Sequence, residues 1–193
     1  MIGTTKGLYS RDVLGTRVLF EEVEVSALAT ENEEALWVGT DGEGLYRWDG
    51  SDFKKRYLQR DSTLFDHVTA IDYNHAHLYL GTTEAMYVFD GGRWSTVGPD
   101  EGLPAGEVTS IDASDWVVYV GTTNGLASYF NREISPIERF TGDHIGAIEV
   151  SGRRIVVATA DEGLVLKLGP AYRILVAPSV VADSALAELS LLL

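Results

Sequence analysis

Two histidines and two glutamates occupy matching places in a motif that recurs along the chain. The motif is a short run of the type Val-Thr-Ala-Ile, and the residues that directly precede its first four copies are Glu24, His67, Glu107 and His144. A fifth copy, Asp-Ser-Ala-Leu at 183–186, follows Ala182. Imidazole nitrogens and carboxylate oxygens are good ligands for zinc and other divalent ions. The pattern therefore predicts a site for a divalent metal ion or a polar ligand; the alternative is that these side chains cap strands or face water.

Two long loops are further candidates for recognition. They span residues 58–66 and 98–106, and the residues in them that we expect to contact a ligand are Arg60, Asp66 and Asp100. Long loops on a rigid scaffold often hold binding residues. The alternative is that both loops are ordinary solvated turns.

Catalytic motifs are absent from the sequence. It has no cysteine nucleophile, no serine in a Gly-x-Ser-x-Gly setting, no His-Glu-x-x-His pair and no phosphate-binding glycine loop. The sequence therefore favours a non-catalytic binding module for a protein or a polar small molecule. Two alternatives stay open: a hydrolase or lyase that uses the Glu and His residues above, and a component of an oligomeric assembly.

Composition excludes several classes of partner and site. The 29 acidic and 15 basic residues give a net charge of -14, which disfavours binding to a phosphate backbone, so no nucleic-acid partner is expected. The absence of cysteine excludes disulfides and thiolate metal sites. No signal-peptide pattern and no apolar run of bilayer length is found. We therefore expect a cytoplasmic protein that does not bind membranes.

A repeat supplies the elements that would position these residues. Its anchor is a Gly-Thr pair that begins at Gly3, Gly39, Gly81 and Gly121, with Ala158 in the fifth copy. Five units of roughly 40 residues, each with four short β-type segments, are typical of β-propeller blades. The sequence predicts an all-β, five-bladed β-propeller with four-stranded antiparallel blades. First strands line a propeller's central channel, so the four residues of the recurring motif are expected to meet at the channel mouth.

The chain begins in the middle of its own repeat. Met-Ile-Gly-Thr-Thr continues a second strand, while the copy at 183–186 supplies a first strand in matching register. We therefore expect one domain over residues 1–193, with a closing blade built from about 1–22 plus 183–193. Pairing the two ends would remove exposed strand edges. The alternative for 183–193 is a helix.

The Gly-Thr pairs and the tryptophans have structural interpretations. The glycine is expected to let a neighbouring strand approach closely, and the threonine hydroxyl to cap the following turn. A positive φ is expected at Gly44, Gly125 and Gly163. We expect the four tryptophans to pack between blades; the alternative is a stacking surface for a sugar. These tryptophans are Trp37, Trp48, Trp94 and Trp116.

The stretch 100–126 resembles the two-component regulator propeller repeat. It reads Gly-Leu-Pro, then Val-Thr-Ser-Ile, then an apolar strand with Gly-Thr and Gly-Leu, and residues 35–50 match the second half of the same pattern. The likeness extends over all five units and weakens at Ala158. In that family such blades form extracytoplasmic sensor domains. The resemblance implies a propeller that binds a ligand or a protein.

Overall fold

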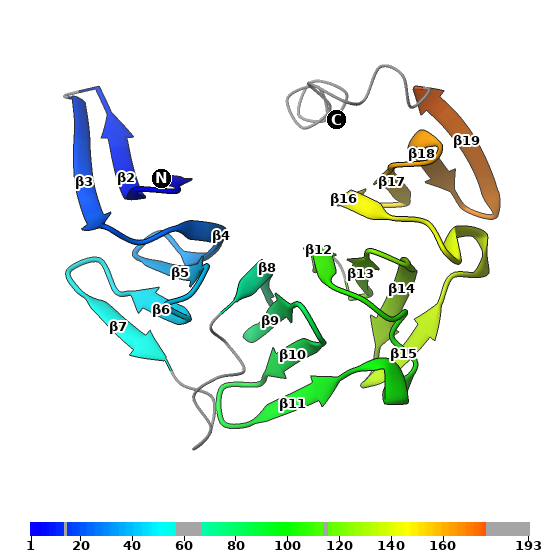
Figure 1. The fold of residues 1–193 in the computed structure, drawn as a ribbon, viewed down its shortest axis with the longest axis horizontal. Coiled ribbons are helices and arrows are strands. Elements are labelled where there is room, and N and C mark those ends of the chain that lie inside the picture. The colour runs from blue at the N-terminus through cyan, green and yellow to red at the C-terminus, as the bar shows by residue number, and fades with distance from the viewer. Residues whose placement is uncertain (14, 57–66, 114–115, 177–193) are drawn as a thin grey trace. The chain divides into compact units, whose positions relative to one another are not determined.

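The computed structural model describes residues 1–13, 15–56, 67–113 and 116–176. These residues form nineteen β-strands and two short 3-10 helices, arranged in five sheets (Figure 1). Within these ranges, no helix has the length and apolar content needed to span a bilayer. The chain divides into two compact units, one made of Met1–Thr83 and Tyr87–Ser95 and the other of Glu84–Met86 and Thr96–Leu193.

The first unit contains two complete sheets and most of a third. The first sheet is formed by β1 (Ile2–Thr4), β2 (Gly7–Asp12) and β3 (Gly15–Glu21). The second is formed by β4 (Val25–Asn32), β5 (Ala35–Thr40), β6 (Leu45–Trp48) and β7 (Phe53–Arg56). The third is formed by β8 (Val68–Asn74), β9 (His77–Thr82), β10 (Met86–Phe89) and β11 (Trp94–Val97).

The second unit contains the remaining two sheets, each preceded by a short 3-10 helix. The fourth sheet is formed by β12 (Val108–Asp112), β13 (Val118–Thr122), β14 (Gly125–Phe130) and β15 (Glu133–Pro136). The fifth is formed by β16 (Ile145–Ser151), β17 (Arg154–Thr159), β18 (Gly163–Leu168) and β19 (Ala171–Val176). The 3-10 helices are η1 (Pro99–Glu101) and η2 (Glu138–Phe140).

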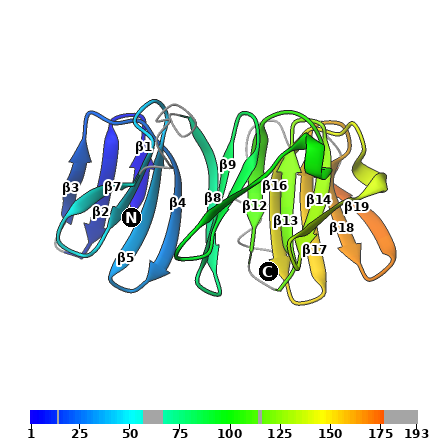
Figure 2. The same cartoon turned by 90° about the horizontal axis from the view of Figure 1, so that it is seen from below.

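The predicted fold class is confirmed: the protein is an all-β, five-bladed β-propeller. Each repeat forms one sheet in which strands consecutive in sequence pair side by side. β4 pairs antiparallel with β5 and β12 with β13, and Figure 2 shows β4 and β5 running the height of the second sheet. Among the described residues the first sheet has three strands. The strand predicted to complete it, at 183–193, lies outside the described residues, and the single domain over 1–193 stays a prediction.

The glycine of each Gly-Thr pair makes room for the inner strand of the next sheet. A Cβ on Gly39 would lie 2.4 Å from Cγ1 of Val68, and one on Gly121 would lie 2.5 Å from Cγ2 of Ile145. Val68 and Ile145 are the first residues of β8 and β16. The predicted close approach is therefore confirmed, and it is made by the strand that follows in the next repeat.

Replacing Gly121 by alanine is expected to lower the free energy of unfolding by about 2 kcal/mol, because the packed site cannot accept the extra carbon without strain. Urea unfolding followed by tryptophan fluorescence measures the loss. The matched control is Gly146→Ala in β16, an exposed position where the added Cβ meets no atom closer than 3.8 Å. This control should stay within about 0.5 kcal/mol of the wild type. Equal losses in the two variants would contradict the packing role.

The threonine of the pair caps the turn that follows, as predicted. The Thr40 hydroxyl donates to the carbonyl of Gly44 at 2.6 Å and accepts from the backbone N–H of Glu43 at 3.2 Å. Gly44 has a φ of 86°, a value that favours glycine. Equivalent hydroxyl-to-carbonyl bonds join Thr4 to Gly7, Thr122 to Gly125 and Thr159 to Gly163.

The inner strands of neighbouring sheets are tied by hydrogen bonds that the sequence patterns did not predict. The hydroxyl of Ser26 donates to the carbonyl of Val68, and that of Thr109 donates to the carbonyl of Ile145. Within the second unit, the carboxylate of Asp112 also accepts from the backbone N–H of Val150 at 2.7 Å. The hydroxyl in the Val-Ser/Thr motif therefore links one repeat to the next.

Candidate functional site

In the first unit, two of the predicted site residues lie beside a third residue that the sequence patterns did not single out. Glu24 precedes β4 and His67 precedes β8. The backbone N–H of Asp41 donates to the carbonyl of Glu24 at 2.9 Å, and Nδ1 of His67 donates to the carboxylate of Asp41. A β-bridge also pairs Asp41 with His67. The His67 side chain is 61% exposed, so this group lies at the surface.

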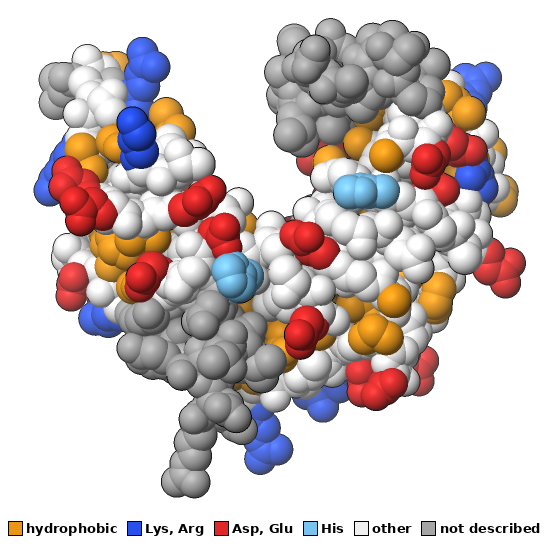
Figure 3. All heavy atoms as spheres, in the orientation of Figure 1, with side chains coloured by type: hydrophobic (Ala, Val, Ile, Leu, Met, Phe, Trp, Pro, Cys, Tyr) orange, Lys and Arg blue, Asp and Glu red, His pale blue; other side chains and the backbone are white. Residues whose placement is uncertain are grey.

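In the second unit, Glu107 and His144 occupy equivalent backbone positions. The carbonyl of Glu107 accepts from the N–H of Thr123, and that of His144 accepts from the N–H of Ala160, both at 3.0 Å. Both side chains are exposed, and Figure 3 shows acidic (red) and histidine (pale blue) side chains at the surface of each unit. The matching positions are thus real features of the repeat. A meeting of the four side chains at a channel mouth stays a prediction.

The described residues provide no ligand set for a metal ion. Within 1–13, 15–56, 67–113 and 116–176, no group of three or more histidine, aspartate or glutamate side chains is placed to hold one. The pairing of His67 with Asp41 is a two-residue contact. A divalent ion at the motif residues stays a prediction from the sequence alone.

Of the three loop residues predicted to contact a ligand, the structure describes one. Arg60 and Asp66 lie outside the described residues. Asp100 lies in η1 and is exposed. The neighbouring Glu101 carboxylate accepts from the backbone N–H of Gly98 at 2.8 Å, which closes the 3-10 turn and gives this part of the 98–106 loop a defined conformation.

Asp143, next to His144, has a pKa raised above its usual value. Burial is the largest cause, followed by the negative charges of Glu162 and Asp161, while Arg139 acts in the opposite direction. Its Oδ2 atom is buried and has no hydrogen-bond partner among the described residues. The ionised form of Asp143 therefore destabilises the folded state.

Asp143→Asn is expected to raise the free energy of unfolding at pH 7 by about 1 kcal/mol. The folded-state pKa lies above the unfolded one, so wild-type stability recovers as the pH falls toward about 3.9 and the difference between the two proteins shrinks. Urea unfolding at pH 7, 5.5 and 4 measures this. Glu133→Gln, an exposed change on β15, controls for the loss of one negative charge. An Asn variant less stable than the wild type at pH 7 would contradict the assignment.

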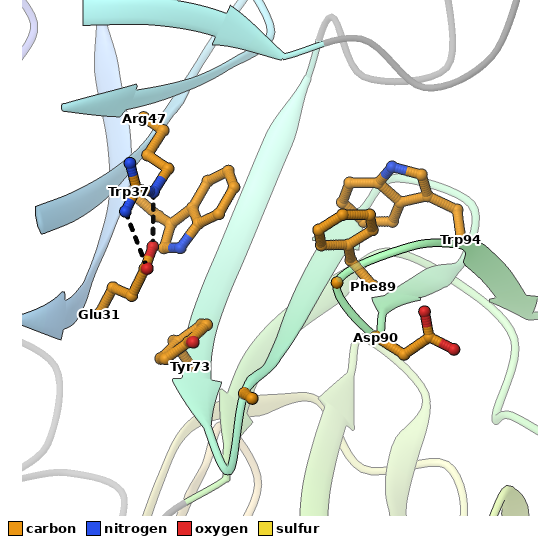
Figure 4. Close-up of a pocket in the computed structure, with 9 residues that line it drawn as sticks. Glu31, Trp37, Arg47, Tyr73, Phe89, Asp90 and Trp94 are labelled. Carbon is orange, nitrogen blue, oxygen red and sulfur yellow. Dashed lines mark hydrogen bonds and ion pairs between the residues drawn. The ribbon is translucent and has the colours of Figure 1, made fainter. Parts of the chain in front are cut away.

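A pocket in the first unit is a further candidate site. It has a volume of about 560 Å³, and we call it the aromatic pocket (Figure 4). Its lining residues come from the second and third sheets: Glu31, Trp37, Arg47, Tyr73, Ala76, Phe89, Asp90, Gly91 and Trp94. Glu31 and Tyr73 lie near the C-terminal ends of β4 and β8. The aromatic pocket is therefore at the opposite ends of these strands from Glu24 and His67.

One wall of the aromatic pocket is an ion pair set by a β-bulge. The pairing of β4 with β5 shifts register between Thr30 and Asn32, which leaves Glu31 as the extra residue. Bulges redirect a side chain, and here Glu31 meets Arg47 of β6. Nε of Arg47 donates to Oε2 of Glu31 at 2.6 Å, and Nη2 donates to Oε1 at 2.8 Å. This hydrogen bonding raises the pKa of Arg47, although burial acts in the opposite direction.

Trp37 forms the floor beside this ion pair. It pairs with Arg47 across β5 and β6, and the guanidinium carbon of Arg47 lies 5.9 Å from the centre of its ring. The Trp37 side chain contributes to the core, with the residue only 5% exposed. Its indole Nε1 is buried and has no hydrogen-bond partner among the described residues. A buried donor without an acceptor costs about 1–3 kcal/mol, so an acceptor supplied to this nitrogen would offset that cost.

The opposite wall is made of two aromatic rings. Phe89 ends β10 and Trp94 begins β11; their ring centroids are 4.9 Å apart and their planes are inclined by 34°. Asp90 holds the intervening turn, because its Oδ1 accepts from the backbone N–H groups of Gly92 and Arg93 at 3.1 and 2.8 Å. Figure 4 shows the two rings on one side of the view, with Trp37 and the ion pair on the other.

Tyr73 adds a polar group at the end of β8. Burial is the largest cause of the rise in its pKa above 10, the charge of Glu31 adds to that rise, and Arg47 opposes it. The phenol is therefore protonated at neutral pH and is available as a hydrogen-bond donor. The aromatic pocket thus combines apolar ring surface, an internal ion pair and neutral N–H and O–H groups.

Several solved structures resemble this chain in fold. The sequence matches no family model and no curated protein. Among solved structures, the extracellular domain of the hybrid two-component system BT3049 of B. thetaiotaomicron is 17% identical, with a TM-score of 0.73 over 91% of this chain and 28% of that one. YCF48 bound to a D1 peptide is 11% identical, with a TM-score of 0.63 over 94% of this chain and 64% of that one.

The WD40 β-propeller domain of Doa1 is 13% identical, with a TM-score of 0.63 over 84% of this chain and 56% of that one. The chain thus spans less than two thirds of the length of each of these three proteins. The likeness to the BT3049 domain supports a propeller fold, and no family model confirms the two-component regulator repeat. Together these likenesses place the chain among proteins with a β-propeller fold.

Proposed function

We propose that this chain is a non-catalytic binding module that recognises a short segment of another protein in the aromatic pocket. The observation that supports this most is the pocket itself, whose volume of about 560 Å³ lies in the range typical of ligand sites. Aromatic rings that are partly exposed at a concave surface favour recognition, because they offer apolar area with little loss of side-chain entropy. YCF48, one of the similar structures, is bound to a peptide, which supports peptide recognition by this fold.

The polar groups of the aromatic pocket are arranged for structure more than for proton transfer. Glu31 is held in a bidentate ion pair with Arg47, and Asp90 accepts two backbone N–H groups of its own turn. The pKa of Tyr73 is raised, away from the neutral range where a general base works best. These features favour binding over catalysis at this site.

A variant that fills the aromatic pocket tests the proposal. Ala76 lines the pocket and is exposed in the turn between β8 and β9, so Ala76→Arg would place a long side chain there without disturbing the core. The matched control is His75→Arg, in the same exposed turn but outside the pocket lining. Both positions have a positive φ, so the two changes meet similar backbone constraints.

A phage-displayed library of random 12-residue peptides would be selected on the wild-type protein, and the enriched peptides would be measured by fluorescence polarisation. We expect Ala76→Arg to weaken their binding at least tenfold and His75→Arg to leave it within about twofold, since a change at the centre of a binding site costs more affinity than a change at its rim. Circular dichroism and urea midpoints verify that both variants fold. Failure to enrich any peptide, or equal binding by all three proteins, would overturn the proposal.

A further inference from the structure

We infer that the aromatic pocket selects an uncharged, mainly apolar segment whose carbonyl oxygen accepts a hydrogen bond from Nε1–H of Trp37. The inference rests on the proposed function and adds the chemistry of the ligand. Three features of the pocket lead to it: its charges, its unsatisfied donor and its ring surface.

The charges of the aromatic pocket disfavour an ionic ligand. An anionic ligand would approach the carboxylates of Glu31 and Asp90 in a protein with a net charge of -14. A cationic ligand would compete with Arg47, whose guanidinium already pairs with Glu31 and lies over the ring of Trp37. An uncharged ligand leaves the ion pair intact and meets neither penalty.

The hydrogen-bonding groups of the aromatic pocket favour a ligand with few polar atoms. Glu31 and Arg47 bond to each other, and Oδ1 of Asp90 bonds to backbone N–H groups. The buried Nε1 of Trp37 is a donor that no acceptor reaches in the part of the chain that the structure describes. A sugar would bring many hydroxyl groups that need new partners on leaving water, whereas one carbonyl supplies the single acceptor that this nitrogen lacks.

The ring surface accounts for the apolar part of the ligand. Phe89 and Trp94 are both partly exposed and lie against each other with inclined planes. An aliphatic side chain placed on these rings is removed from water, which favours binding in proportion to the apolar area covered. A residue with an aliphatic side chain and its own backbone carbonyl provides both contacts.

The indole nitrogen of Trp37 is covered in this structure, so a ligand oxygen reaches it only after a neighbouring side chain moves aside. Arg47 lies over the indole ring, and its side chain is 23% exposed. Arg47 keeps its ion pair with Glu31, so the proposal leaves that pair in place.

The test uses NMR spectra of the full chain with 15N-labelled tryptophan indoles, in which Trp37→Phe assigns the resonance of Trp37. Three probes are titrated: N-acetyl-leucine methylamide, N-acetyl-lysine methylamide and methyl glucoside. We expect the leucine probe to move the Trp37 indole proton downfield in a saturable way. We also expect Trp37→Phe to weaken its binding by about three- to tenfold, and Trp48→Phe, which lies outside the pocket lining, to leave it unchanged.

A second replacement separates the hydrogen bond from packing. Benzothienylalanine at position 37 keeps the shape of tryptophan and puts sulfur in place of N–H. It should therefore weaken the binding of the leucine probe as much as Trp37→Phe does. The inference is overturned if the leucine probe shifts Trp94 but not Trp37, if the lysine or sugar probe binds more tightly, or if no probe binds. In each case, selected peptides that bind the wild type but not Ala76→Arg would still support the proposed function. If no such peptides are found, both the proposed function and this inference are contradicted.

Discussion

Phe140→Ala is expected to lower the free energy of unfolding by about 3–5 kcal/mol, the cost of removing a large buried ring. Phe140 ends η2 and is 0% exposed. It joins a cluster with Leu126, Ile145 and Val157, and its ring meets that of Tyr172 edge-on at a centroid distance of 5.8 Å. Phe140 thus packs in a cluster shared by the fourth and fifth sheets, and its loss leaves a cavity there.

Urea unfolding monitored by circular dichroism measures this loss. Phe140→Leu is the matched control, because it retains most of the buried volume and should cost less than about 1.5 kcal/mol. A Phe140→Ala variant no more destabilised than Phe140→Leu would show that the buried volume of the ring does not stabilise this cluster.

Arg47→Met is expected to lower the free energy of unfolding by about 3 kcal/mol at pH 7. The substitution keeps an apolar stem over Trp37 but leaves the carboxylate of Glu31, whose side chain is only 18% exposed, without its bidentate partner. Removing one member of a largely buried ion pair is more harmful than removing both, because an uncompensated charge remains. The double variant Glu31→Gln/Arg47→Met should therefore recover at least half of the lost stability.

The pH dependence provides a second readout of the same effect. In Arg47→Met, the unpaired carboxylate destabilises the folded state only while it is ionised, so the loss relative to the wild type should shrink as the pH falls toward about 4. Unfolding curves at pH 7, 5.5 and 4.5 test this. A loss that is constant over this range, or a double variant as unstable as Arg47→Met, would show that the ion pair has no role in holding the aromatic pocket.

The fold could be predicted from the sequence because its determinants repeat. The Gly-Thr pair recurs for a steric reason that acts the same way at Gly39 and Gly121, where the inner strand of the next sheet passes within contact distance. The turn after each pair is likewise capped by the same hydroxyl, as at Thr40 and Thr122. A sequence motif that occurs in several copies can be recognised even when each copy is weak.

The aromatic pocket could not be predicted in this way because its charged wall departs from the repeat. Arg47 occupies the place held by Ser10, Val88, Ser128 and Leu166 in the other repeats, and a charge among apolar and small residues was the available signal. The bulge that turns Glu31 toward it depends on how β4 registers with β5, which single-strand patterns do not reveal. The four tryptophans were expected to pack between blades; Trp37 is buried, but Trp116 is 72% exposed, so the expectation is wrong for Trp116. The missing partner of the Trp37 nitrogen is visible only in three dimensions.

Asp41 was missed for a related reason. It follows the second strand of its repeat, and it reaches His67 only because successive repeats place the end of one strand beside the start of another. Aligning the repeats shows which residues occupy the same place in each sheet. It does not show contacts between different places in neighbouring repeats, and the contact between Asp41 and His67 is one of these.

The hydroxyl-to-carbonyl bonds of Ser26 and Thr109 have a consequence for how such a chain can lengthen or shorten during evolution. In two of the repeats this motif supplies a donor, Ser26 or Thr109, and the first residue of the next inner strand, Val68 or Ile145, supplies the acceptor. A tandem duplication therefore copies both halves of the junction at once, and the new repeat can join its neighbours without inventing a fresh interface. Gene duplication and loss could change the number of repeats while junctions of this kind stay chemically the same.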